Sequence, residues 1–303
     1  MRASVFMAGD DFAGLRRRIA EIEGRPLGVE APPSPAVPPQ GPERPEAPRL
    51  APRRAEKLLP FGVEGLDCLL GGGLRRNALH EVRAETTRAG SAATGFAAAI
   101  LARLTVGDDR PLLWVMEEAA VREGGHPHGP GLDRFGLDPG RLIVVVTRRP
   151  EETLWVFEEG LRCAGLAGVL GEIRGHPRVL DLTASRRLAL RARDGGVMGI
   201  LLRQAAAAEP GAAATRWLVE PRPAGTLDDF AAGIGRPAWR LHLERNRAGA
   251  TGRFDLEWDH DARSFALAPL ATPALSRPGA ALPADRPDLA RTAGTVVAYR
   301  RTG

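Results

Sequence analysis

Apolar residues gather in short runs between residues 56 and 268, and these runs alternate with stretches in which apolar positions recur every three or four residues. Short continuous apolar runs are typical of buried parallel strands, and the periodic stretches are typical of helices. The pattern predicts an α/β fold with a mostly parallel central sheet and helices on both faces. The predicted strands are 78–82, 112–116, 142–146, 168–173 and 197–202, and the predicted helices are 91–104, 151–164 and 185–192.

The pattern changes after the last of these strands. Apolar and polar residues then alternate over 217–219, 239–245, 253–258 and Ser264–Leu267, and short turns such as Ala248-Gly249-Ala250 separate the segments. Alternation between turns is typical of antiparallel strands with one solvated face. We therefore expect an antiparallel C-terminal extension of the same sheet.

Different patterns flank this domain of residues 56–268. Residues 1–25 predict an amphipathic helix, and residues 26–55 predict a semi-rigid linker because ten prolines lie between positions 26 and 52. Residues 269–303 are again rich in proline and predict a mostly flexible tail. The helix packs either on its own domain or on another protein, and the tether favours the second. Its apolar stripe consists of Phe12, Leu15, Ile19 and Ile22.

Composition narrows the class of protein. The absence of a long apolar segment predicts a cytoplasmic protein without membrane contact. The two cysteines, Cys68 and Cys163, lie in apolar segments, and we expect them to be buried thiols. The net charge of +5 favours an acidic partner. Lys57 is the sole lysine, so no lysine follows it to serve a phosphate site.

The segment from Arg83 to Ser91 lies between a predicted strand and a helix of small residues, where a nucleotide-binding domain has its phosphate loop. Such a loop needs glycines for close backbone approach, a lysine for the terminal phosphates and a hydroxyl for magnesium. The preceding sequence, FGVEGLD at 61–67, GGGL at 71–74 and HEV at 80–82, resembles the RecA recombinase family. Aligned without gaps, the family's two loop glycines, its lysine and its hydroxyl residue fall on Ala84, Ala89, Gly90 and Ser91.

Only the hydroxyl is retained, so the resemblance implies a RecA-like core with a degenerate loop, no enzyme activity and no ATP as cofactor. An alternative is that Arg83 or Arg88 replaces the missing cation. Glu118 falls on the family's catalytic glutamate and Gln204 near its phosphate-sensing glutamine; as isolated residues, both are also typical of solvated strand ends. Glu172 is the nearest acid to the expected magnesium ligand, in a register that the sequence leaves open.

Two further groups of residues are candidates for binding. Arg245 and Arg247 fall where the recombinase family has a basic pair at its subunit interface, and such arginines bind either a partner or a phosphate backbone. The alternative is a solvated surface, because no aromatic residues are interleaved. His126 and His128 are separated by one proline, without a third ligand nearby, so no metal site is predicted.

The pattern as a whole resembles the ImuA family, RecA-like accessory proteins of a bacterial mutagenesis cassette. The resemblance covers roughly residues 9–268, including FAGLRRRIAEIEG, the degenerate loop with ATGFAAAIL, DRFGLDPGRLIVV and WRLHLERNRAGATGRFDLEW. It implies a non-catalytic adaptor in SOS-induced error-prone translesion DNA synthesis. The implied partners are ImuB, which is an inactive relative of Y-family polymerases, RecA and, indirectly, an error-prone replicative-type polymerase. The alternatives are an ATPase with an atypical loop and a direct single-stranded DNA binder.

Overall fold

A computed structural model describes the backbone of residues 5–8 and the full structure of residues 58–224 and 235–269. Within the segment 1–25 that was predicted as a helix, residues 5–8 form a strand instead. The rest of that segment with its stripe, the linker 26–55 and the tail from residue 270 onward lie outside the described residues; the stripe consists of Phe12, Leu15, Ile19 and Ile22. These assignments therefore stay predictions.

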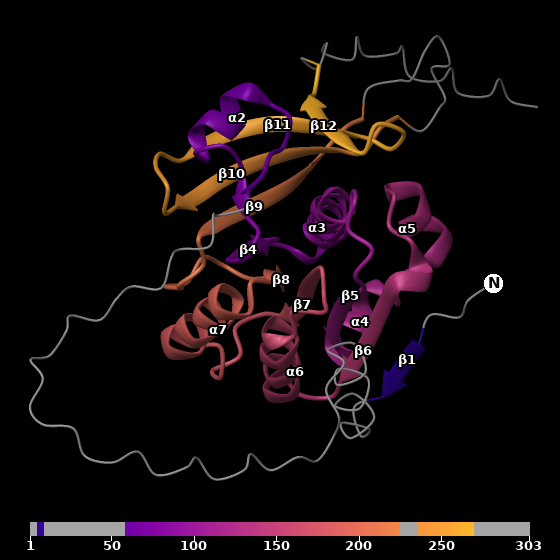
Figure 1. The fold of residues 1–303 in the computed structure, drawn as a ribbon, viewed down its shortest axis with the longest axis vertical. Helices are drawn as coiled ribbons and strands as arrows, with labels where there is room; N and C mark the ends of the chain where they lie inside the picture. Colours follow the sequence, from indigo (N-terminus) through magenta and orange to yellow (C-terminus); the bar gives the residue numbers. More distant parts are fainter. Residues whose placement is uncertain (1–4, 9–57, 225–234, 270–303) are drawn as a thin grey trace, which may run out of the picture. The chain divides into compact units, whose positions relative to one another are not determined.

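The core is a ten-stranded sheet in the order β1-β6-β5-β7-β8-β4-β9-β10-β11-β12 (Figure 1). All neighbouring strands from β1 to β9 run parallel, which confirms the predicted α/β fold. β1 was not predicted, and it pairs along β6 at the edge of the sheet. The parallel strands are β1 (Val5–Ala8), β4 (Leu79–Arg83), β5 (Leu112–Glu117), β6 (Leu142–Thr147), β7 (Gly168–Arg174), β8 (Met198–Gln204) and β9 (Thr215–Arg222).

The antiparallel extension consists of β10 (Ala238–Asn246), β11 (Gly252–Asp259) and β12 (Ser264–Leu267), and this part of the prediction is also confirmed. The prediction for 217–219 was only half right. This segment belongs to β9, which runs antiparallel to β10 but parallel to β4. β9 thus joins the parallel and the antiparallel part of the sheet. Its own sequence does not reveal this role, because its pattern of apolar and polar residues is compatible with parallel and with antiparallel pairing.

Helices cover both faces of the parallel part, as predicted. α3 (Gly90–Leu104) lies on one face, and α6 (Pro150–Arg162) and α7 (Leu182–Gly195) lie on the other (Figure 1). Apolar side chains form one cluster around α3 and the antiparallel strands and a second cluster under α6 and α7. α2 (Glu64–Leu69), α4 (Glu118–Gly124) and α5 (Gly129–Phe135) were not predicted. Each has only six or seven residues, too few to reveal a helical period.

The glycine-rich segment before β4 has a structural role. The Asp67 carboxylate accepts hydrogen bonds from the amides of Phe61 and Gly62, at 2.6 and 2.8 Å, and so closes the turn into α2. Gly73 has a φ of +133°, and a Cβ there would lie 2.4 Å from the Leu59 carbonyl oxygen. Only glycine fits that approach, which brings β2 (Leu58–Leu59) against β3 (Leu74–Arg75).

The two cysteines differ in environment. Cys163 is buried as expected, but the expectation was wrong for Cys68, which is exposed. Cys68 lies on α2, and only Leu66 of this short helix is buried. Among the helices of the described segments, none has the length and apolarity that crossing a bilayer requires.

Candidate functional site

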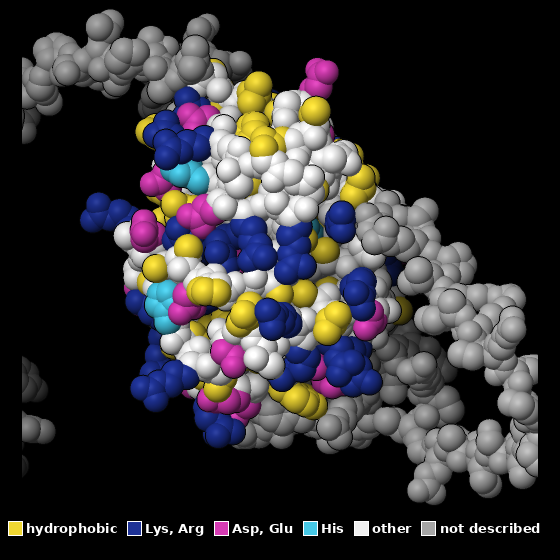
Figure 2. All heavy atoms as spheres, turned by 90° about the vertical axis from the view of Figure 1, so that its left-hand side faces the viewer, with side chains coloured by type: hydrophobic (Ala, Val, Ile, Leu, Met, Phe, Trp, Pro, Cys, Tyr) yellow, Lys and Arg dark blue, Asp and Glu magenta, His cyan; other side chains and the backbone are white. Residues whose placement is uncertain are grey.

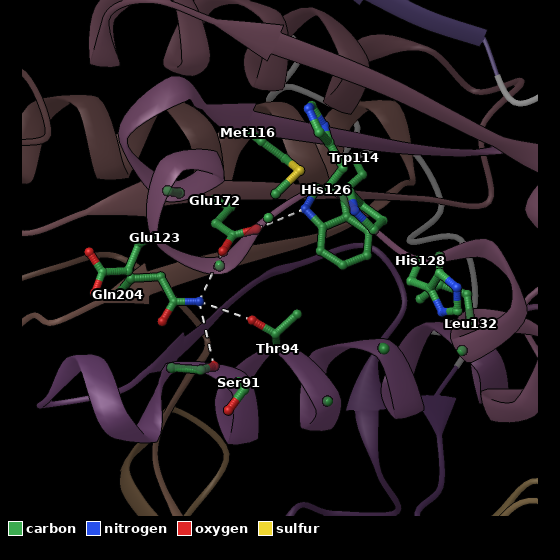
Figure 3. A pocket seen from close by; sticks show the side chains of 18 of the residues that line it. Ser91, Thr94, Trp114, Met116, Glu123, His126, His128, Leu132, Glu172 and Gln204 are labelled. Atoms are coloured by element: carbon green, nitrogen blue, oxygen red, sulfur yellow. Dashed lines mark hydrogen bonds between the residues drawn. The ribbon is translucent and has the colours of Figure 1, made fainter. Parts of the chain in front are cut away.

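A cavity of about 590 Å³ opens at the carboxyl ends of β5, β7 and β8 (Figure 3). The first half of α3 forms one wall, and α4, α5 and the segment between them form the opposite wall. In open α/β sheets, ligands bind beyond the carboxyl ends of the strands. The chain therefore has a hollow where this fold binds ligands, and the hollow adjoins the degenerate loop through Thr87, Gly90 and Ser91.

A buried carboxyl group lies at the floor of the cavity. Glu172 on β7 is 4% exposed. Its Oε2 accepts a hydrogen bond from Trp114 Nε1 at 3.1 Å, and its Oε1 accepts one from Gln204 Nε2 at 2.9 Å. Burial raises the pKa of Glu172, and these two N–H groups lower it by less. The strand register also places Glu172 opposite Met116 of β5, which resolves the position that the sequence left open.

Gln204 links the floor to α3. Besides Glu172, its Nε2 donates to Thr94 Oγ1 at 2.9 Å and faces the Gly90 carbonyl oxygen at 3.5 Å (Figure 3). A Cβ built on Gly90 would lie 2.5 Å from Gln204 Oε1. Gly90 is the position that aligns with the recombinase lysine, so the amide of Gln204 fills the space in which a side chain at that position would begin.

The two alanines of the degenerate loop face inward. Ala84 is buried, and it pairs with the strand region of β8 because its amide donates to the Arg203 carbonyl at 2.9 Å while its carbonyl accepts from the Ala206 amide at 2.9 Å. The amide of Ala89 bonds to the Thr86 carbonyl at 3.1 Å, and the amide of Gly90 bonds to the Thr87 carbonyl. These amides are used within a 3₁₀ turn and in strand pairing.

The structure brings only some of the predicted residues together. Gly90, Ser91 and Gln204 line the cavity, whereas Ala84, Ala89 and Glu118 do not. Glu118 begins α4 and pairs with Arg122 at 2.9 Å on the surface, with 42% of its side chain exposed. Nothing in the sequence indicated Trp114 or Thr94. Trp114 lies in an apolar strand and bonds to Glu172 on the neighbouring strand, and Thr94 lies in a helix of small residues and bonds to Gln204 on β8. Neither local pattern reveals these contacts.

Among the residues that the structure describes, Arg174 at the end of β7 is the one arginine that lines the cavity. Its Nη2 donates to Thr87 Oγ1 at 3.1 Å, and its Nη1 pairs with Glu123 at 3.3 Å. His126 and His128 also line the cavity. Across the described ranges, no three histidine, cysteine, aspartate or glutamate side chains are arranged to hold a metal ion.

A second cluster of charged residues lies on the other face of the sheet, the face on which α6 and α7 pack. Glu81 on β4 pairs with Arg216 Nε at 3.0 Å and lies 4.0 Å from Arg203 Nη1. Arg83 on the same strand donates to Glu244 at 2.8 Å and to the Ala206 carbonyl at 3.0 Å. The side chains of Glu81 and Arg83 are both 5% exposed. The alternative of Arg83 as a phosphate-binding cation conflicts with this position.

The same cluster anchors residues 205–214, a segment that we call the strap. Arg203 Nη2 donates to Glu209 at 2.9 Å, and Arg216 donates to the carbonyl of Glu209. Arg245 donates to the Gly211 carbonyl, and burial followed by the neighbouring Arg247 and Arg216 lowers the pKa of Arg245. Arg245 is therefore partly occupied by a structural contact, while Arg247 is exposed.

On the face shown in Figure 2, basic side chains gather across the middle of the surface, and most of the acidic side chains lie around them. Arg187 and Arg191 of α7 both pair with Glu158, at 2.6 and 3.0 Å, and Arg240 pairs with Asp255 at 3.0 Å. These pairs show that Arg187, Arg191 and Arg240 have carboxylate partners within the chain.

Comparison with known proteins gives two matches in Caulobacter vibrioides. The chain is 32% identical over 218 residues to "Protein ImuA" of strain NA1000 / CB15N and, equally, to "Protein ImuA" of strain ATCC 19089 / CIP 103742 / CB 15. The matched region covers 68% of this chain and 85% of each relative. No protein-family model matches the chain.

Proposed function

Because the chain belongs to the ImuA family, we propose that it is a non-catalytic adaptor in SOS-induced error-prone translesion DNA synthesis. In this proposal it binds ImuB, RecA or both through a RecA-like core, and an error-prone replicative-type polymerase indirectly. The name of the relatives supports a part in the ImuA/ImuB mutagenesis cassette.

The packing of Gln204 on Gly90 carries the non-catalytic part of the proposal. Phosphoryl transfer is mostly positioning and charge stabilisation, and the loop lysine supplies both in phosphate loops. Here that position has no side chain, and Gln204 Oε1 fills the adjacent space. The amides of Ala89 and Gly90 bond to carbonyl groups of their own turn. Both the cation and part of the amide cradle are therefore missing.

The alternative of an arginine-dependent ATPase has little support from the geometry. Arg83 is held by Glu244 and the Ala206 carbonyl on the opposite side of the sheet. Arg88 is exposed, and it lines a separate hollow with Glu85 and Arg240 instead of the cavity. Equilibrium titration of the full chain with labelled ATP and magnesium tests this alternative. We expect no saturable binding, and micromolar binding that Arg88→Ala abolishes would overturn the non-catalytic adaptor.

The adaptor role is tested by co-purification of the full chain with ImuB and with RecA. We expect Leu15→Asp with Ile19→Asp to abolish partner capture, because the change places two charges in the predicted apolar stripe. Leu190→Asp is the matched control, since Leu190 is already 48% exposed on α7. If neither partner is captured by the unchanged chain, the adaptor proposal is wrong; if capture survives the double substitution, only the assignment of the stripe is wrong.

Direct binding of single-stranded DNA is tested separately by salt-dependent retention of the full chain. Neutralising exposed Arg247 reports on phosphate contact, whereas neutralising Arg245 also removes its bond to the Gly211 carbonyl. Retention at low salt that Arg247→Gln weakens would favour the DNA-binding alternative.

A further inference from the structure

The N–H groups of Trp114, Gln204 and Arg174, three of the side chains that line the cavity, are already engaged. Trp114 Nε1 donates to Glu172, and Gln204 Nε2 has Glu172, Thr94 and Gly90 oxygens around it. At the mouth, Arg174 donates to Thr87 and pairs with Glu123. An acceptor-only anion such as a phosphate would therefore have to break internal bonds to obtain N–H donors from these side chains.

Hydrogen-bond acceptors, by contrast, remain available. A carboxylate has about four lone-pair sites, and each oxygen of Glu172 accepts one N–H from the described residues. The three oxygens around Gln204 Nε2 fix the orientation of its amide, so the oxygen Oε1 is directed to Gly90, where the described residues supply it with no donor. The floor of the cavity at Glu172 and Gln204 thus offers acceptors to a ligand, whereas its N–H groups are already engaged.

The charges around Glu172 also favour a ligand that donates hydrogen bonds and carries positive charge. Glu172 is buried beside two neutral donors and lacks a cationic partner among the described residues, and its pKa is raised by that burial. The Arg174 guanidinium at the mouth is paired with Glu123 at 3.3 Å. A buried carboxylate without a cation is costly, and a cation that enters with its own hydrogen bonds removes this cost.

The remaining walls suit an apolar stem. Ala98 of α3, Met116 of β5 and Leu132 and Phe135 of α5 also line the cavity. A metal ion fits poorly, because the described residues offer no group of three ligands. A ligand with several donors, a positive charge and an apolar stem satisfies the floor and the walls together.

We propose that this cavity binds an alkylguanidinium group whose planar head bonds to the carboxylate of Glu172 and whose stem lies against α3 and α5. The group belongs either to a free small molecule or to an arginine side chain of a partner protein. The inference rests on the cavity alone and does not depend on the adaptor role.

The test is a titration of the full chain followed by the indole N–H resonance of Trp114, which reports the bond to Glu172 directly. The chain has five tryptophans, so Trp114→Phe assigns the resonance. The probes are butylguanidinium, its neutral isostere butylurea, N-acetylarginine methylamide and magnesium ATP. We expect saturable shifts with the guanidinium probes, binding of butylurea that is about tenfold weaker or more, and no shift with ATP.

Comparison of the two guanidinium probes distinguishes the sources. Tighter binding of butylguanidinium indicates a free small molecule, and equal or tighter binding of N-acetylarginine methylamide indicates a protein side chain. Equal affinity for butylguanidinium and butylurea, or binding of neither guanidinium probe, would overturn the proposal. This comparison uses the unchanged chain, so it does not depend on whether a variant folds.

A pair of variants then locates the carboxylate that binds the cation. Glu172→Gln keeps the shape of the side chain and removes its charge, and we expect it to weaken butylguanidinium binding about tenfold or more. Glu118→Gln is the matched control, because Glu118 pairs with Arg122 outside the cavity. Undiminished binding to a folded Glu172→Gln variant would also overturn the proposal.

Discussion

Two buried glutamates on opposite faces of the same sheet differ in how their charge is compensated. Glu172, at the floor of the cavity, accepts hydrogen bonds from the neutral groups Trp114 and Gln204. Glu81, beneath the strap, lies 3.0 Å from Arg216 and 4.0 Å from Arg203. The first is a carboxyl group with raised pKa and room for a ligand, whereas the second is held inside a network of arginines.

The contrast between Glu172 and Glu81 shows that the buried arginines of this chain have a structural role. The buried guanidinium groups of Arg83, Arg203 and Arg216 support the structure by holding the strap and the neighbouring strands together. The loop, where a phosphate site would need a cation, has Gly90 at the corresponding position. An abundance of positive charge in the sequence therefore does not indicate a phosphate site, because the geometry assigns most of the buried charge to internal pairs.

The strongest test of this comparison removes the charge of Glu81. We expect Glu81→Gln to lower the free energy of unfolding by about 4 kcal/mol, because it leaves Arg203 and Arg216 buried without that carboxylate. Thermal or urea unfolding of the purified chain measures the loss. A change in the free energy of unfolding below about 1 kcal/mol would show that the pairing of Glu81 with Arg203 and Arg216 contributes little, and the contrast with Glu172 would then be wrong.

His80 tests whether a buried group with neutral partners resists gaining charge. Its ring nitrogens contact Thr215 Oγ1 at 2.8 Å and the Arg75 carbonyl at 2.9 Å, and burial lowers its pKa from 6.5 to about 4. The unfolded chain therefore takes up this proton first, so the stability that neutral His80 contributes is complete above pH 6.5 and is lost as the pH falls to about 4.

The shift corresponds to about 3 kcal/mol. Urea unfolding between pH 7 and pH 4 should show this loss, superimposed on the effects of the carboxylates. In His80→Gln, which cannot gain the proton, the pH dependence should be weaker by about that amount. An unchanged pH dependence would mean that His80 is not held neutral.

The third test places a lysine at Gly90, the position that aligns with the lysine of the RecA recombinase family. We expect Gly90→Lys to destabilise the chain by about 2 kcal/mol, because its Cβ would overlap Gln204 Oε1. We also expect no gain in ATP binding, since the amides of Ala89 and Gly90 remain bonded within their turn. Adding Gln204→Ala should recover most of the stability. Tight ATP binding by the single variant would contradict the interpretation of the loop as structural.

Glu172→Gln should have a smaller effect on stability, and of opposite sign. The pKa of Glu172 is raised in the folded state, so the stability associated with its protonated form is present at low pH and is lost as the pH rises through the folded value. Glu172→Gln carries no ionisable group at this position, so it does not lose this stability as the pH rises. Its melting temperature relative to the unchanged chain should therefore increase from pH 5 to pH 8, and a constant difference would contradict the raised pKa.

The smallest effect is expected at the exposed pair of Glu118 and Arg122. Removing one partner by Glu118→Gln should change the free energy of unfolding by about 0.5 kcal/mol or less, because solvent screens a pair on a helix surface. This variant sets the scale for the others in the same unfolding assay.

Much of the fold could be predicted from the sequence. The five apolar runs correspond to β4 to β8, and three of the four alternating segments correspond to the antiparallel strands β10 to β12, because burial on two faces or on one face produces these patterns directly. The fourth, 217–219, lies in β9, which also pairs in parallel with β4. The short helices α2, α4 and α5 and the strand β1 were missed, since four to seven residues do not establish a period.

The sequence by itself determined that the loop contains no lysine and that none follows it, because residue identity is independent of folding. It also determined the strands and the long helices, whose patterns are local. Only the tertiary structure decided that Gln204 covers Gly90, that Glu172 meets Trp114, and that Arg83 points away from the cavity. These contacts join residues that are 58 or more positions apart, so they depend on the order and register of the strands, which no local pattern specifies.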